Sequence, residues 1–178
     1  MMNPFYTGIG SRETPKEILS QMTQIAQVLA EHGMILRSGG APGADQAFEK
    51  GVTTWGKKQI FIPWEGFENR TTKEKCVYNL EDGDHEGAMG YFKKYHPGWM
   101  NVSKGGQRLH ARNTYQVLGL DLDTPSLFVI CWTYKGGGTG GTGQAIRLAK
   151  ACFIPVFDLG SMDVEQVGIE VTKLMEKN

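Results

Sequence analysis

The sequence lacks an excess of charge of either sign, because 19 Lys and Arg residues are balanced by 19 Asp and Glu residues. A protein that coats nucleic acid through bulk electrostatics carries a strong positive charge, so a formal net charge of zero argues against that class. A local basic patch is still compatible with this balance. The composition is otherwise ordinary for a globular protein, with 40% hydrophobic and 21% charged residues.

Cysteine is also scarce, and long apolar runs are absent. The three cysteines, Cys76, Cys131 and Cys152, are odd in number, far apart and outside any metal-ligand spacing. This pattern excludes a disulfide scaffold and favours a reducing compartment. No stretch is apolar enough to span a membrane, and the first residues do not follow the pattern of a signal peptide. We therefore expect a cytoplasmic protein without a membrane partner.

Short apolar runs alternate with helix-like segments at both ends of the chain. The first 63 residues follow the order strand, helix, strand, helix, strand, and the helix after Pro15 repeats apolar residues every three or four positions. The second half continues with a helix at 105–121, a strand at 126–132, a helix at 143–152, a strand at 153–159 and a helix at 162–177. This alternation predicts one α/β domain over residues 1–178, a Rossmann-like doubly wound parallel sheet with helices on both faces.

The middle of the chain, residues 64–102, breaks this alternation. It is polar, aromatic and dotted with glycine, and it contains no clean strand pattern, although residues 85–95 have the character of a helix. Its aromatic content argues against disorder, and a long irregular segment inside a compact domain is often functional. We expect an insertion after the third strand that forms a lid or rim over a site, with Trp64 as its best base-stacking residue.

Three strand-to-helix junctions share one design, in which glycine and hydroxyl residues join a strand to a helix. They are TGIGSRET at 7–14, RSGGAPGAD at 37–45 and YKGGGTGGTGQ at 134–144. In a parallel sheet such junctions meet at the carboxyl ends of the strands, glycine lets the backbone approach a ligand, and the start of the next helix suits an anion. The expected binding residues for a nucleotide-type or phosphate-bearing ligand are Gly8, Gly10, Ser11, Arg12, Ser38, Gly39, Gly40, Gly43, Gly138, Thr139, Gly140, Gly141, Thr142 and Gly143, with Arg37 as a further candidate charge.

Familiar cofactor and metal motifs are missing from these junctions. No Gly-Lys-Ser/Thr ends a glycine run, and the first junction has Glu13 where the dinucleotide fingerprint needs glycine or alanine. The acidic run at 81–87 lacks the spacing of a calcium loop, and no histidine pair has the HExxH arrangement. We predict neither a cofactor nor a metal.

Four stretches resemble motifs of a known superfamily. SGGAPGAD at 38–45 resembles the S-G-G-A-x-G-x-D motif of the DNA-processing protein A family, GIGSR at 8–12 its upstream G-S-R junction, and ARN at 111–113 its R-N element. GGTGQAIRLA at 140–149 resembles the glycine-rich turn of the wider superfamily, which includes the lysine-decarboxylase-like (LOG) nucleotide phosphoribohydrolases. The resemblance covers about residues 5–63 and 103–160.

This resemblance implies a Rossmann-like sheet whose loops bind the phosphate of a nucleotide or nucleic acid. It adds Arg112 as a phosphate-binding residue and Asn113 as a partner for a loop backbone. By analogy with the relatives, it also implies a homo-oligomer. Asp45 is a candidate for a ribose hydroxyl or for a general base, and the alternative is an acid placed in a first helical turn by the helix dipole.

The two named branches predict different activities. The LOG-like branch implies N-glycosidic cleavage of nucleoside monophosphates, but Gln144 and Arg147 stand where its motif has threonine and glutamate. A replacement carboxylate would have to come from Asp45, Glu49 or the insertion. The DNA-processing branch implies binding of single-stranded DNA. We expect a nucleotide-binding or sensing protein, and the N-glycosidase, the single-strand DNA binder and a purely structural or interaction protein remain alternatives.

Overall fold

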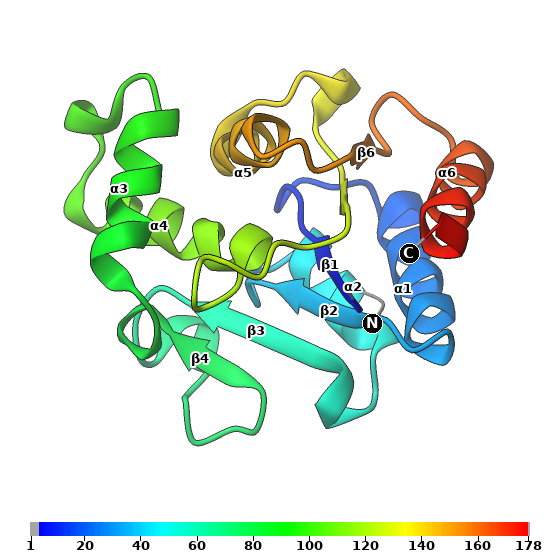
Figure 1. Cartoon of the computed structure of the whole chain (residues 1–178), viewed down its shortest axis with the longest axis horizontal. Coiled ribbons are helices and arrows are strands. Elements are labelled where there is room, and N and C mark those ends of the chain that lie inside the picture. Colours follow the sequence, from blue (N-terminus) through cyan, green and yellow to red (C-terminus); the bar gives the residue numbers. More distant parts are fainter. Residues whose placement is uncertain (1–3, 178) are drawn as a thin grey trace.

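The computed structural model describes residues 4–177 and contains a six-stranded sheet in which each strand pairing is parallel. The strands lie in the order β4-β3-β2-β1-β5-β6 (Figure 1). Their bounds are β1 Phe5–Gly8, β2 Ile35–Ser38, β3 Lys58–Ile62, β4 Val77–Asn79, β5 Val129–Cys131 and β6 Val156–Asp158. The strand order reverses between β1 and β5, so a ligand crevice is expected at the carboxyl ends of these two strands.

Helices cover both faces of this sheet, as the alternating sequence predicts. The α-helices are α1 Lys16–Glu31, α2 Ala44–Gly51, α3 His85–Tyr95, α4 Lys104–Leu118, α5 Gly140–Ala151 and α6 Val164–Lys177. One face is covered by α1, α2 and α6, and the other by α3, α4 and α5. The doubly wound Rossmann-like fold is therefore confirmed. Among the helices of the described range, none combines the length and the apolar character that crossing a bilayer requires.

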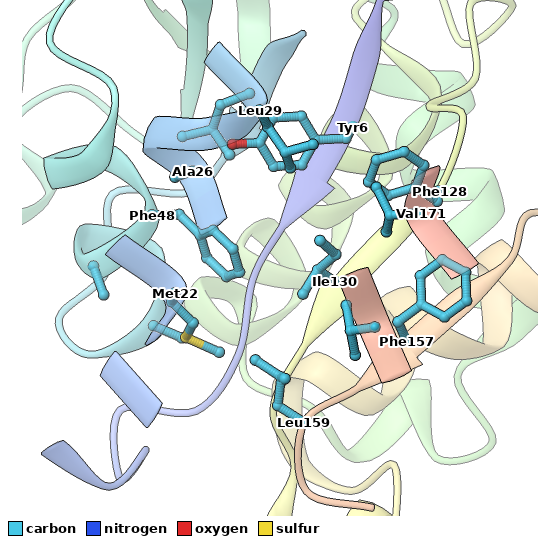
Figure 2. Packing of buried hydrophobic residues seen from close by; sticks show 14 of the residues in the cluster. Tyr6, Met22, Ala26, Leu29, Phe48, Phe128, Ile130, Phe157, Leu159 and Val171 are labelled. Atoms are coloured by element: carbon cyan, nitrogen blue, oxygen red, sulfur yellow. The ribbon is translucent and has the colours of Figure 1, made fainter. Parts of the chain in front are cut away.

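The core beneath α1, α2 and α6 follows from the helical spacing of apolar residues. Met22, Ala26 and Leu29 recur at three- and four-residue intervals, so they lie on one side of α1 and face the sheet. Figure 2 shows them beside Tyr6 of β1 and Phe48 of α2. Full burial of each large apolar side chain stabilises the fold by about 1.5–3 kcal/mol. This layer fixes the position of the first two glycine junctions.

The opposite face buries most of α4, and this burial carries polar residues into the protein. Every residue from Ala111 to Leu118 is buried, although the segment contains arginine, asparagine, threonine and glutamine. Tyr115 packs on Phe61 of β3, while Val117 packs with Val129 and other residues below α5. Polar side chains on α4 must therefore find partners inside the protein or at an internal cavity.

The expectation that residues 64–102 contain no strand is wrong. Val77–Asn79 forms β4, which pairs in parallel with β3 at the edge of the sheet, and Ile60 is opposite Val77. A strand of three residues is too short to display an alternating pattern. The expected helix at 85–95 coincides with α3. Within residues 64–102, the segment that belongs neither to the sheet nor to its covering helices is mainly the connection from β3 to β4.

Candidate ligand-binding site

A cavity of about 370 Å³ lies at the carboxyl ends of the strands, within the range of small-molecule sites. The first junction, the third junction and α4 form most of its walls. The residues of the sequence-based site that line it are Gly10, Ser11, Arg12, Asp45, Arg112, Asn113, Thr139, Gly140, Gly141 and Thr142. The structure thus brings together three segments that are far apart in the sequence.

The third junction presents the start of α5 to this cavity. Thr139 precedes the helix, but its side chain makes no capping hydrogen bond, and the first turn contains no acidic residue. The first N–H groups of a helix have no acceptor within the helix, and they form the positive end of its dipole. Apart from its chain neighbours and the backbone of its own helix, a Cβ atom at Gly141 would meet no atom of the described chain within 4 Å. The first turn of α5 is therefore open to an external anion.

The loop before α5 is held in place by hydrogen bonds that involve Thr133 and Asp158. The N–H of Gly138 donates to Thr133 Oγ1 at 2.9 Å, and the hydroxyl of Thr133 in turn bonds the Asp158 carboxylate. Gly138 and Gly140 have left-handed φ angles of 60° and 67°, which glycine adopts without the strain that a side chain would add. These two glycines therefore permit the turn that places the start of α5 at the cavity.

Arg112 and Asn113 of α4 line the cavity beside this turn. Arg112 Nη1 donates to the carbonyls of Gly39 at 2.5 Å and Phe61 at 2.7 Å, and its Nε donates to Asn113 Oδ1 at 3.1 Å. Asn113 Nδ2 donates to the Gly141 carbonyl at 3.2 Å. Asn113 therefore connects the arginine to the backbone of the third junction, the kind of contact that the resemblance implies. Burial lowers the pKa of Arg112 to about 10, so the guanidinium stays charged at neutral pH.

The second junction binds an anion of its own, the carboxyl group of Asp45. This side chain is 5% exposed and accepts hydrogen bonds from the backbone at Ala41, Gly10 and Gly39. Burial raises the pKa of Asp45 to about 6, and the nearby Arg112 charge opposes part of that rise. The start of α2 offers little to an external phosphate, because the N–H groups of Ala44 and Gln46 already bond backbone carbonyls, those of Ser11 and Ala41.

Several residues of the sequence-based site support the loops and do not line the cavity. Ser38 Oγ donates to the Gly8 carbonyl at 2.6 Å and ties the ends of β1 and β2 together. A Cβ at Gly8 would lie 2.6 Å from the Phe48 ring, and one at Gly43 would lie 2.6 Å from the Ser11 carbonyl oxygen. The residues in this group are Gly8, Ser38, Gly39, Gly40, Gly43, Gly138 and Gly143.

Two charged candidates are engaged elsewhere. Glu49 pairs with Arg70, with Nη1 and Oε2 2.8 Å apart, and with Lys58 at 3.4 Å. It follows Asp45 by four residues, which moves it about 6 Å along α2 from the cavity. Arg37 Nε donates to Gln59 Oε1 at 2.9 Å, and its guanidinium lies over the Phe5 ring. Neither residue lines the cavity.

Among the aromatic residues of the middle segment, whose sequence allows either a small core of their own or a base-stacking wall, Phe67 lines the cavity. Trp64, the preferred stacking candidate, does not line it and packs edge-on against Phe67, with ring centroids 5.4 Å apart. Two further lining residues were not anticipated from the sequence. His110 and Gln116 line the cavity from α4. Gln116 follows Arg112 by four residues, so helical spacing alone could have placed both on one face.

The carboxyl groups that line the cavity are those of Asp45 and Glu13. Arg147, at the position of the LOG glutamate, donates its Nε to the Tyr95 carbonyl and does not line the cavity. Within residues 4–177, no group of three or more His, Cys, Asp and Glu side chains could hold a metal ion.

The fold defines a class, the Rossmann-like α/β proteins with the architecture of DNA processing protein A. No protein-family model matches the chain, and no curated protein matches it in sequence. Among solved structures, DNA processing protein A from Helicobacter pylori is similar, with a TM-score of 0.58 and 20% sequence identity over 96% of this chain and 74% of that chain. That structure was described for its unique mode of single-stranded DNA binding. At this identity the likeness establishes the fold.

Proposed function

We propose that the cavity binds a nucleotide-type ligand through its phosphate group. The observation that carries the proposal is the open first turn of α5, which lines the cavity beside Arg112 and Asn113. A helix start of this kind offers backbone N–H donors and a positive dipole, and a buried arginine adds a fixed charge. Phe67 gives the cavity an aromatic wall from the connection between β3 and β4, so this part of the chain acts as a rim of the site.

A substitution at Gly141 tests the proposal directly. Gly141→Val places a branched side chain in open space at the cavity wall, so we expect the fold to persist. The new side chain would occupy the proposed position of the phosphate. We expect binding of nucleoside 5′-monophosphates, measured by calorimetry, to weaken by at least about 100-fold, as when several charge-assisted hydrogen bonds are lost together. Gly168→Val is the matched control, because Gly168 is also a helical glycine with open space around it and lies outside the cavity. Unchanged binding by Gly141→Val would refute the proposal.

A second candidate ligand is single-stranded DNA, and the observation that favours it is the similarity to a structure described for binding it. The same phosphate chemistry serves both ligands, but their salt dependence differs. A strand contacted at several phosphates loses affinity steeply as salt rises, whereas a mononucleotide held in one cavity shows a shallow slope. We expect the shallow slope, because the chain has a net charge of zero. Binding to oligonucleotides that tightens with length and has a steep slope would favour the second candidate instead.

A further inference from the structure

Three polar side chains meet beside Gly39 at the inner wall of the cavity. Arg112 Nη1, Gln116 Nε2 and Asp45 Oδ2 all lie within 2.6 Å of the point where a Cβ of residue 39 would be. Each of the three residues is at most 5% exposed, and each lines the cavity. Only glycine leaves space for this convergence. We refer to Asp45, Arg112 and Gln116 as the polar trio.

Gln116 is the member of the polar trio that brings a neutral amide to the cavity wall. Its backbone carbonyl accepts hydrogen bonds from Thr7 Oγ1 and Ser126 Oγ. Its side-chain Nε2, in contrast, lies beside the polar atoms of Asp45 and Arg112, and the residue is only 2% exposed. A buried amide left unpaired costs free energy, so such groups usually find a protein, water or ligand partner. Gln116 lines the cavity, so a ligand bound there can hydrogen-bond with its amide.

The neighbours of the polar trio indicate which part of a nucleotide lies there. On one side, Asn113 bonds both Arg112 and the backbone of Gly141, so the trio adjoins the proposed phosphate position. On another side, Phe67, Ala41 and Leu109 belong to one apolar cluster and line the cavity together. A nucleotide has the same order of parts, with a phosphate, a polar sugar and a base with apolar faces. The sugar is the part that matches the polar trio.

We propose that Gln116, with Asp45 and Arg112, binds the sugar hydroxyls of the ligand, so that the cavity selects ribonucleotides over 2′-deoxyribonucleotides. This inference rests on the proposed function and deepens it. A hydroxyl both donates and accepts, and the trio offers an amide with both capacities, a carboxyl group and an arginine donor. A site built to bond a hydroxyl discriminates strongly against the analogue that lacks it, because the buried polar groups are then left unpaired.

The test compares paired ligands on the full chain. Calorimetry would measure the dissociation constants of adenosine and guanosine 5′-monophosphates and of their 2′-deoxy counterparts. We expect the wild type to bind the ribose form at least about tenfold more tightly. In Gln116→Met, which keeps the length of the side chain but removes its amide, the preference should fall to less than about threefold, mainly through weaker binding of the ribose form.

A matched control separates recognition from general effects of removing a buried amide. Gln144 is fully buried, both of its amide atoms lack a partner among the described residues, and it lies outside the cavity. Gln144→Met should keep the wild-type preference. Equal binding of ribose and deoxyribose forms by the wild type would overturn this inference and leave the proposed function standing. An unchanged preference in Gln116→Met would also overturn it, as would a lost preference in Gln144→Met. Absence of binding to every nucleotide would contradict the proposed function itself.

Discussion

The second and third glycine junctions have a similar sequence design, but they differ in the residues that surround the start of the following helix. At the second junction, Asp45 lies in the first turn of α2 and its carboxyl group takes the surrounding backbone N–H groups. At the third junction, the first turn of α5 contains no acid and its threonine does not cap the helix. One junction therefore contains its own anion, while the other is open. The comparison teaches that two glycine-rich junctions of similar sequence can differ in whether a side chain of the protein already takes the surrounding N–H groups.

The largest effect should come from filling the space at the second junction. Gly39→Ala would push a Cβ into the polar trio, so Arg112 or Asp45 would lose its present partners. Leaving a buried charge without its partners typically costs about 3–5 kcal/mol of unfolding free energy. Urea denaturation measures it, and Gly141→Ala is the control, with an expected change below about 1 kcal/mol because its Cβ meets open space. Similar stabilities for the two variants would show that the junctions are equally open.

The pH dependence of stability should reveal the internal anion of the second junction. The pKa of Asp45 is raised from an ordinary 3.8 to about 6, so the folded state keeps a proton that the unfolded state releases. This group consequently makes stability fall as pH rises from about 4 to about 6, by about 3 kcal/mol in total. Asp45→Asn mimics the protonated acid and should remove that component.

Denaturant titrations at several pH values between 4 and 7 measure this component. The unfolding free energy of the wild type, minus that of Asp45→Asn, isolates the contribution of Asp45 from other titrating groups. We expect this difference to favour the wild type at low pH and to decline as pH rises. A difference that increases with pH would mean that the folded state favours the ionised carboxylate, contrary to the burial of Asp45.

The smallest stability effect should come from giving the third junction an acid like that of the second. Asp45 is the second residue of α2, and Gly141 is the second residue of α5. Gly141→Asp should exceed the neutral Gly141→Asn in stability by about 0.5 kcal/mol, because a negative charge favours the start of a helix. The same charge should weaken binding of inorganic phosphate and nucleotides by at least about tenfold relative to Gly141→Asn. Equal phosphate binding by the two variants would argue that the anion site lies elsewhere.

Much of the fold could be predicted from the sequence, and the errors have identifiable causes. Alternating apolar and helical segments predicted the parallel sheet, its two covered faces and α3 within the middle segment. β4 was not predicted, because a strand of three residues is too short to display an alternating pattern of apolar and polar residues. Trp64 and Phe67 are three residues apart, and no local pattern distinguishes the residue that lines the cavity from the one packed behind it.

The sequence by itself determined the class of fold and the edge of the sheet at which the three junctions gather. It could do so because periodicity and glycine placement are local properties of the sequence. The junctions that follow parallel strands all lie at the same edge of the sheet. The tertiary structure decided which junction already holds a side chain of the protein and which charged candidates do not line the cavity. It also decided which polar side chains of α4 line the cavity. Those outcomes depend on contacts between distant residues, such as Arg112 with Gly39, 73 positions apart, and on burial that no local pattern encodes.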